Sequence, residues 1–346
     1  MNIHKKYMSI CLQLAKQGVG KVSPNPLVGC VIVKDNQIIG QGFHEFYGGP
    51  HAEVNAIKNI RDQPLINGST LYVNLEPCAH HGKTPPCSDL IIKHKVAKVV
   101  IGCVDSFHAV SGKGIEKLKK AGIEVIIGVL ERKSLELNKR FFTFHSEKRP
   151  FIILKWAQTA DGFIDIDRTS PIDINNWITL IDSKILVHHW RAEEQAIMVG
   201  TNTALNDNPK LTVREITGKN PLRIVLDMSL RLPKDIHLFD KTVPTFVFNS
   251  KKNEIIKNLE FIRINTDENI IHQILNELYN REIQSVIIEG GAQLLNSFIK
   301  QNLWDEARVF TGKKEFSTGL KSPQINKEPK FSMQIETDIL NTYVNA

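Results

Sequence analysis

The sequence has few of the features that mark secreted, membrane-spanning or disordered chains. It contains no apolar run near the roughly 18 residues needed to cross a bilayer, and no low-complexity segment. Residues 1–17 carry a basic pair and apolar residues at helical spacing, which predicts an amphipathic helix rather than a signal peptide. The 5 cysteines are an odd number in a chain of 346 residues, so we expect reduced thiols and a cytoplasmic protein.

Aromatic residues are also scarce, at 7% of the chain, and they do not cluster beside the basic residues. The formal net charge of +7 would allow an acidic partner, but Lys and Arg are scattered along the sequence. We therefore expect a small-molecule substrate and neither a nucleic-acid nor a membrane partner. The sequence leaves open whether the chain forms a homo-oligomer.

The length of the chain favours two domains, because single cores usually stop growing below this size. A charged, proline-terminated stretch at 141–150 predicts a boundary that gives domains 1–147 and 148–346. In the first, a hairpin at 27–42 precedes alternating strands and helices, which indicates a layered α/β fold. Four short apolar runs predict a second α/β domain, and they lie at 196–200, 223–227, 245–249 and 285–289.

The strongest chemical motif combines His51, Cys78 and Cys87, which offer one imidazole and two thiols. Three protein ligands leave one position of tetrahedral zinc open, as is typical of catalytic rather than structural zinc. Glu53, two residues after His51 at the start of an expected helix, could reach a water in that position and act as general acid and base. His-x-Glu followed by Pro-Cys is the signature of zinc nucleobase deaminases.

The spacing leaves alternatives open, because eight residues separate Cys78 from Cys87 where most such deaminases have two. Both thiols could instead be buried core residues, or His80 or His81 could serve as a ligand and close a structural zinc site. The remaining cysteines lie in apolar settings and are interpreted as core residues, namely Cys11, Cys30 and Cys103.

The string from Leu75 to Cys87 resembles the deaminase of riboflavin biosynthesis, in which a long loop separates the two cysteines. The segments 24–29 and 51–56 are similar to the same family, and so are second-half segments at 155–162, 176–179, 198–203 and 207–214. The resemblance is to the bifunctional deaminase-reductase. It implies an N-terminal cytidine-deaminase-like three-layer α/β domain and a C-terminal dihydrofolate-reductase-like α/β domain, with Zn²⁺ and NADPH as cofactors.

The resemblance also implies roles for individual residues. It assigns Asn25 to the substrate of the deaminase. It assigns the following to NADPH: Ala157, Trp177, Thr203, Asp207, Gly291, Ala292, Gln293, Leu294, Leu295, Asn296 and Ser297. It assigns the following to the reductase substrate: Asn175, Arg191, Leu211, Arg214 and Glu289.

Physical reasoning supports some of these roles. Gly290-Gly291, between an expected strand and helix, suits a phosphate but could be a structural turn. Arg191 and Arg214 could each clamp a ribose phosphate or form an ion pair within the protein.

Four segments depart from the family pattern. Asn175 stands where the family has Ser, after a loop lengthened at 165–174, and Met228 replaces a Ser after Asp227. The stretch 105–108 also differs, and the tail after Phe310 fits poorly.

The implied activity is deamination of 2,5-diamino-6-(5-phosphoribosylamino)pyrimidin-4(3H)-one to 5-amino-6-(5-phosphoribosylamino)uracil, followed by NADPH reduction of the ribosyl group to a ribityl group. The alternative is a zinc deaminase of nucleic acid or free nucleotide with a non-reductase second domain.

Overall fold

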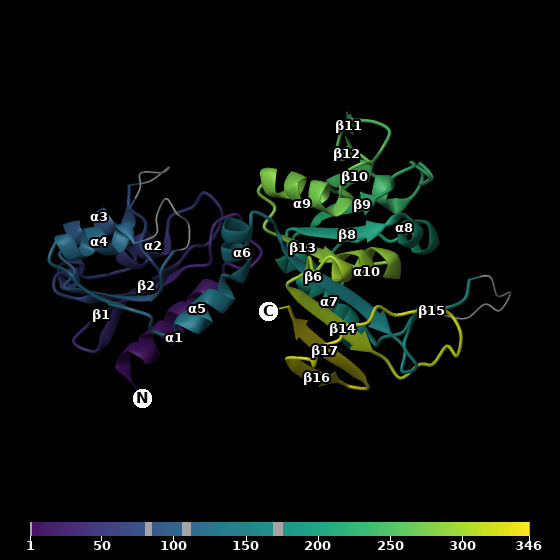
Figure 1. Ribbon diagram of the computed structural model, residues 1–346. Coiled ribbons are helices and arrows are strands. Elements are labelled where there is room, and N and C mark those ends of the chain that lie inside the picture. Colours follow the sequence, from purple (N-terminus) through teal and green to yellow (C-terminus); the bar gives the residue numbers. More distant parts are fainter. Residues whose placement is uncertain (1, 80–84, 106–111, 169–175, 346) are drawn as a thin grey trace. The chain divides into compact units, whose positions relative to one another are not determined.

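The computed structural model describes residues 2–79, 85–105, 112–168 and 176–345. The chain divides into two compact units, Met1–Lys148 and Arg149–Ala346 (Figure 1). We describe each unit by itself. Among the described residues, no helix is long and apolar enough to cross a membrane.

The first unit is built on a five-stranded sheet of order β2-β1-β3-β4-β5. Its strands are β1 (Gly29–Lys34), β2 (Gln37–Phe43), β3 (Thr70–Leu75), β4 (Lys98–Cys103) and β5 (Glu124–Ile127). The predicted hairpin is confirmed: β1 and β2 pair antiparallel across Asp35 and Asn36, which both have the positive φ typical of a tight hairpin turn. β3, β4 and β5 run parallel, so their carboxyl ends meet at one edge of the sheet.

Helices cover both faces of this sheet (Figure 1). They are α1 (Ile3–Lys16), α2 (Ala52–Lys58), α3 (Cys87–Lys93), α4 (Lys113–Lys120), α5 (Glu131–Leu137) and α6 (Lys139–Glu147), with a 3-10 turn at Gln63–Ile66. Successive residues of β1 alternate between the faces: Cys30 and Ile32 pack with α2, α3 and α4, and Val31 and Val33 pack with α1. The three-layer prediction is confirmed. Cys11, Cys30 and Cys103 are buried, as expected of core residues.

α5 and α6 are elements that we did not assign from the sequence. α6 occupies the stretch that looked mixed and charged. Phe141 and Phe144, three residues apart, place their rings on one face of this helix and are both buried. These two buried rings anchor the helix to the unit although most of its other residues are polar or charged.

The second unit contains a ten-stranded sheet of order β11-β12-β10-β9-β8-β13-β6-β14-β17-β16. Its strands are β6 (Phe151–Gln158), β8 (Ala196–Gly200), β9 (Leu222–Leu226), β10 (Thr245–Asn249), β11 (Glu254–Ile256), β12 (Leu259–Arg263), β13 (Ser285–Ile288), β14 (Glu306–Thr311), β16 (Phe331–Ile335) and β17 (Asp338–Val344). The strands from β12 to β14 are parallel, whereas β11, β17 and β16 run antiparallel to their neighbours. β7 (Phe163–Asp165) and β15 (Leu320–Lys321) form a separate pair.

Four helices connect these strands: α7 (Ile181–Glu193), α8 (Thr201–Asp207), α9 (Ile270–Asn280) and α10 (Ala292–Lys300), with a 3-10 turn at His237–Phe239. Side chains of α9 and α10 pack on one face of the sheet, and those of α7 pack on the other. α10 begins directly after Gly290-Gly291, as predicted. The tail that resembled the family poorly supplies β16 and β17, which extend the sheet beyond β14.

Candidate active sites

Three side chains of the first unit form a compact cluster of metal-ligand type. His51 is the N-cap of α2, Cys78 follows β3, and Cys87 is the first residue of α3. Their ligand atoms all lie within 4.8 Å of one another. His51 Nδ1 is 3.6 Å from Cys78 Sγ and 3.3 Å from Cys87 Sγ. The fold therefore brings together the three residues that the sequence assigned to one metal.

This cluster fits zinc in both geometry and chemistry. Two donors bound to one tetrahedral zinc ion at normal bond lengths lie roughly 3.5 Å apart, which matches the measured separations. One imidazole and two thiols are typical zinc ligands. Hydrogen bonding with Cys87, and then with His51, lowers the pKa of Cys78 to about 4 although burial opposes it. A thiolate is the form that binds metal.

Glu53 lies in the first turn of α2, beside the cluster, and its residue is 3% exposed. Burial raises the pKa of its carboxyl group, while neighbouring His51 lowers it in part. A carboxyl group whose pKa is raised toward neutrality exchanges protons more readily at neutral pH than an exposed one. Its carboxyl group thus lies next to the three candidate metal ligands, in the place that the sequence predicted for a general acid and base.

Asn25, the residue expected to contact substrate, contacts His44, whose ring lies beside the ring of His51 in this cluster. Asn25 Nδ2 is 3.0 Å from His44 Nε2, and His44 Nδ1 is 2.9 Å from the carbonyl oxygen of Pro50. If Nδ1 donates to Pro50, Nε2 is left to accept the amide proton of Asn25. The His44 ring lies 5.8 Å from the His51 ring, centroid to centroid. Sequence reasoning missed His44, although a histidine seven residues before a ligand histidine was a signal.

A second missed residue is Glu76, which precedes Pro77-Cys78. Its buried carboxylate accepts hydrogen bonds from the backbone N–H groups of Asp105, Gly112, Gly114 and Ile115, at 2.9–3.3 Å. A Cβ atom on Gly114 would lie 2.0 Å from the Pro77 carbonyl oxygen, so only glycine permits this close approach. The start of α4 is thus fixed against the segment that carries Cys78.

Several sequence interpretations lie outside the described residues. His80 and His81, the alternative ligands, fall there, as do positions 106–108 of the atypical stretch at 105–108. Asn175, assigned to the reductase substrate, also lies outside the described part of the chain.

The second unit holds a cleft of about 1640 Å³ at the carboxyl ends of β6, β8, β9 and β13. This edge of a parallel sheet is where α/β proteins bind ligands. The cleft is lined by most residues assigned from the sequence: Ala157, Trp177, Arg191, Thr203, Asp207, Leu211, Arg214, Glu289, Gly291, Ala292, Gln293, Leu294 and Ser297. Leu295 instead packs in the core, and Asn296 is not part of the lining.

The Gly-Gly junction has the form that a close-approaching ligand requires. Gly290 has a φ of +123°, which favours glycine. A Cβ atom on Gly291 would lie 3.1 Å from Thr203 Oγ1, so a larger residue would crowd the start of α8. The N-terminus of α10 therefore borders the cleft beside the Thr203 hydroxyl, with a glycine rather than a larger side chain at its N-cap.

A largely buried group of charges forms one wall of the cleft. Arg191 donates through Nε and Nη2 to the two carboxylate oxygens of Glu289, at 3.2 and 2.8 Å. Burial alone would raise the pKa of Glu289, but Arg191 and then Lys155 lower it to about 2. Burial lowers the pKa of Lys155, and Glu289 opposes that shift. Lys155 was not assigned a role, although a lysine inside an apolar strand was a visible signal.

The two arginines expected to hold phosphate differ in their surroundings. Arg191 is engaged by Glu289, and its Nη1 donates to the Thr212 carbonyl. Arg214 is exposed at the cleft, and its Nη1 donates to Thr212. His188 accepts a hydrogen bond from the Arg214 backbone at Nδ1, and burial lowers its pKa to about 4, so the ring is neutral near pH 7. Arg214 is thus the better placed of the two for a phosphate.

The lengthened loop adds Arg168 to the cleft. Its Nη2 lies 2.6 Å from Asp207 Oδ1, and its Nε lies 2.7 Å from Asp165 Oδ2. Burial raises the pKa of Asp207, and Arg168 opposes this. Met228 lines the cleft with a side chain that cannot donate, and its carbonyl oxygen accepts from Ser250.

Two protein-family models match the chain, one on each unit. The family described as "cytidine and deoxycytidylate deaminase zinc-binding region" matches residues 1–103. The family described as "RibD C-terminal domain" matches residues 150–314.

Curated relatives and solved structures match nearly the whole chain. The riboflavin biosynthesis protein RibD of Aquifex aeolicus is 42% identical over 92% of this chain and 89% of its own length. That of Actinobacillus pleuropneumoniae is 37% identical over 98% and 94%. A Thermotoga maritima diaminohydroxyphosphoribosylaminopyrimidine deaminase/5-amino-6-(5-phosphoribosylamino)uracil reductase superposes with a TM-score of 0.87 at 38% identity, covering 98% of both chains. Acinetobacter baumannii RibD gives 0.88 at 31% identity, covering 99% of this chain and 98% of its own. With both catalytic units matched in one chain, the protein belongs to the RibD family of bifunctional deaminase-reductases of riboflavin biosynthesis.

Proposed function

We propose that the chain deaminates 2,5-diamino-6-(5-phosphoribosylamino)pyrimidin-4(3H)-one to 5-amino-6-(5-phosphoribosylamino)uracil and then reduces the ribosyl group to a ribityl group with NADPH. The observation that carries the first step is the cluster of His51, Cys78 and Cys87 beside buried Glu53. The cleft at the carboxyl edge of the second sheet supports the second step. We assign deamination to residues 1–147 and reduction to residues 148–346.

In the deaminase unit, His51, Cys78 and Cys87 would hold zinc, whose chemistry is to activate a water molecule toward attack on the amine-bearing carbon. Glu53 would take one proton from the attacking water and deliver it to the ring nitrogen, and would then take the second proton from the added oxygen and deliver it to the departing amine. Its buried position keeps competing water from its carboxyl group. Asn25, whose amide nitrogen lies 3.0 Å from His44 Nε2, presents its amide to the sugar of the substrate.

In the reductase unit, NADPH supplies the hydride, and the protein orients the cofactor and substrate. We place the cofactor along Thr203, Gly291–Leu294 and Ser297, which line the cleft. Arg214 binds the substrate phosphate through its exposed guanidinium. Lys155, whose pKa is lowered by burial, provides the proton that accompanies the hydride. Arg191 acts through Glu289, which keeps the charge of Lys155 balanced. Asn175 remains assigned to the same substrate.

The two half-reactions can be tested in one tube. Purified zinc-loaded protein is given the diaminopyrimidine phosphoriboside, and ammonia release and NADPH consumption are followed in turn. Ammonia followed by NADPH loss supports both steps. Ammonia release without NADPH consumption would contradict the reductase assignment. The absence of both ammonia release and NADPH consumption would contradict the proposed substrate.

A chelator provides the internal control. Removing zinc should stop ammonia release but leave NADPH oxidation intact when the aminouracil intermediate is supplied directly. Loss of both activities on chelation would contradict the separation of the two sites. The buried, unbridged state of the core cysteines fits the cytoplasmic location that we propose.

A further inference from the structure

Arg168 lines the cleft of the second unit from the stretch in which this chain departs from its family. Its guanidinium group donates from all three nitrogens. Nε lies 2.7 Å from Asp165 Oδ2, and Nη2 lies 2.6 Å from Asp207 Oδ1. Nη1 lies 3.4 Å from the carbonyl oxygen of Asn206. A guanidinium group is planar and its donors have a fixed geometry, so these acceptors in two separate segments set its orientation.

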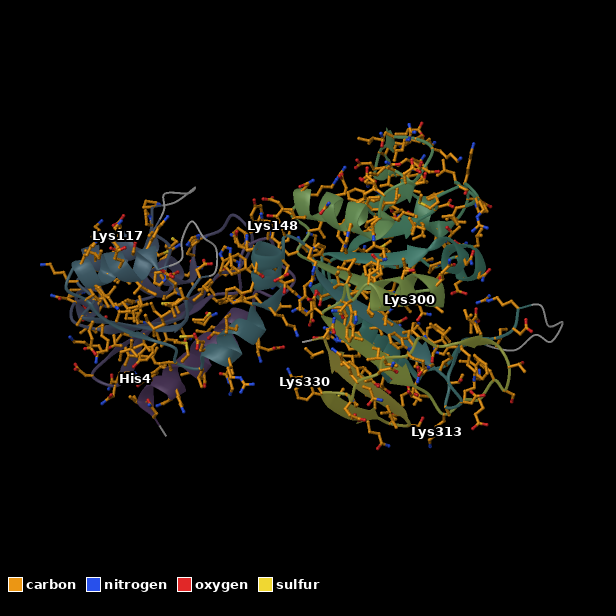
Figure 2. All side chains as sticks on the ribbon, viewed as in Figure 1. His4, Lys117, Lys148, Lys300, Lys313 and Lys330 are labelled. Carbon is orange, nitrogen blue, oxygen red and sulfur yellow. The ribbon has the colours of Figure 1, made fainter. Side chains whose placement is uncertain are left out.

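Asp165 anchors this guanidinium group from the side of β7. It is the last residue of β7, and its backbone pairs with Leu320 of β15 (Figure 1). Its Oδ1 accepts a hydrogen bond from the backbone N–H of the next residue, while Oδ2 accepts from Arg168. The loop after β14, in which Lys313 is labelled in Figure 2, leads to β15 and carries Gly319. A Cβ atom on Gly319 would lie 2.3 Å from the Asp165 carbonyl oxygen, so closely packed backbone supports this anchor.

Asp207, the second anionic partner, is the last residue of α8 and also lines the cleft. Arg168 occupies Oδ1 of its carboxylate, and no group among the described residues donates a hydrogen bond to Oδ2. The side chain is 44% exposed, so a ligand in the cleft can reach that oxygen. Burial raises the pKa of this carboxyl group, and the charge of Arg168 opposes the rise. An ionised carboxylate only accepts hydrogen bonds, so Oδ2 suits a hydroxyl or amide group of a ligand.

The charges around Asp207 matter because a dinucleotide is itself an anion. Asp165 and Asp207 both line the cleft, and two carboxylates without a cation would repel the phosphates of such a ligand. Arg168 lies between them and pairs with both. It therefore reduces this repulsion while it leaves one oxygen of Asp207 available.

We propose that Arg168 is a positioning residue for the dinucleotide cofactor. It holds the Asp207 carboxylate in one orientation and offsets its charge, so that Oδ2 accepts a hydrogen bond from a neutral hydroxyl or amide group of the bound cofactor. This inference rests on the proposed reductase function, in which Asp207 belongs to the cofactor site. It adds a residue from the lengthened loop, to which the family resemblance assigned no role.

Two other roles of the ion pair predict different results. If Arg168 occupied the place of the cofactor and had to be displaced, its removal would strengthen cofactor binding. If the pair only fastened the loop to α8, its removal would change stability and leave cofactor binding unchanged.

The test is calorimetric titration of NADP⁺ into the zinc-loaded, full-length protein. Arg168→Met should raise the dissociation constant by roughly tenfold, because the carboxylate loses both its orientation and its counter-charge. Arg168→Lys keeps the charge but not the planar donor geometry, so its dissociation constant should lie between those of the wild type and Arg168→Met. In steady-state assays, Arg168→Met should raise the KM for NADPH and change kcat little.

The matched control is Arg281→Met. Arg281 pairs with Glu260 and Glu277 at 2.6 and 2.7 Å, its side chain is 34% exposed against 33% for Arg168, and it is not part of the cleft lining. Because both arginines make comparable surface ion pairs, the two Met variants should lose similar free energy of unfolding. Only Arg168→Met should lose affinity for NADP⁺.

A double-mutant cycle shows whether Arg168 acts through Asp207. Asp207→Asn should weaken NADP⁺ binding, and adding Arg168→Met to it should cost far less than in the wild-type background. The inference is overturned if Arg168→Met binds NADP⁺ as well as or better than the wild type, or if it costs the full tenfold in the Asp207→Asn background. A wild type that binds no NADP⁺ would contradict the proposed reductase function and this inference with it.

Discussion

The deaminase and reductase sites gather their residues in different ways. The metal cluster and Glu53 come from one stretch, between residues 51 and 87, and each ligand sits at the end of a helix or strand. The reductase cleft draws on residues from Lys155 to Ser297. In the first site, a bound metal would balance the charge of the cysteine thiolates. In the second, the buried charges are balanced by one another.

This difference predicts which substitutions should change activity alone and which should also change the stability of the fold. A proton carrier beside a preformed ligand cluster can be changed with little effect on the fold. A carboxylate that neutralises two buried cations cannot, because removing it leaves those cations uncompensated. The predictions below test this contrast, from the largest effect to the smallest.

The largest effect should follow from Glu53→Gln. The amide fills the same space but cannot carry a proton, so the deamination rate should fall by about 10²–10⁴-fold. NADPH oxidation with the aminouracil intermediate and the zinc content should both remain at wild-type levels. The matched control is Glu116→Gln on the exposed face of α4, which should leave ammonia release unchanged. A Glu53→Gln variant with normal ammonia release would remove Glu53 from the mechanism.

In the reductase unit, Glu289→Gln should cost stability as well as activity. It leaves Arg191 and Lys155 buried without their counter-charge, which should lower the free energy of unfolding of this unit by about 3–5 kcal/mol. Denaturant unfolding would measure it, with Glu254→Gln, from an exposed ion pair, as the control expected to lose at most about 1 kcal/mol. Equal losses in the two variants would mean that the buried charges contribute no more than surface ones.

The same pair gives a pH dependence with a defined sign. The pKa of Glu289 is lowered to about 2 in the folded protein, below the roughly 4.3 of an unfolded glutamate. Its contribution to stability is therefore present above about pH 4.3 and is lost as the pH falls toward 2. The difference in unfolding free energy between wild type and Glu289→Gln should shrink over this range. A constant difference from pH 6 to pH 3 would contradict the lowered pKa.

The sequence predicted much of this arrangement, and there is a physical reason why it did not predict the rest. The hairpin at Asp35-Asn36, the His51, Cys78 and Cys87 cluster and the glycines before α10 depend on local spacing, so the sequence predicted them. The pairing of Arg191 with Glu289 joins residues 98 positions apart, and nothing in either neighbourhood indicates the partner. The tail after Phe310 was judged by resemblance alone, so the alternating pattern of β16 was overlooked.

Arg214, the exposed arginine of the cleft, offers a direct test of phosphate binding. Arg214→Met should raise the KM of the reductase for its phosphorylated substrate by roughly tenfold while changing kcat little, because one charged hydrogen-bonding group to phosphate is lost. A dephosphorylated substrate should show no difference between the variant and the wild type. If the variant behaves alike on both substrates, Arg214 does not bind the phosphate.

The smallest effect should come from Glu76→Gln, which sharpens the comparison within the deaminase unit. The amide oxygen of the variant still accepts hydrogen bonds, but its NH₂ group replaces the second acceptor oxygen and faces backbone N–H groups that also donate. About 1–2 kcal/mol of the anchoring should therefore be lost. Because the anchored segment leads into Cys78, zinc should dissociate faster and ammonia release should fall modestly, while excess zinc restores the rate. The reductase activity of the same chain is the control. Slower ammonia release that excess zinc does not restore would mean that Glu76 does not act through the position of Cys78.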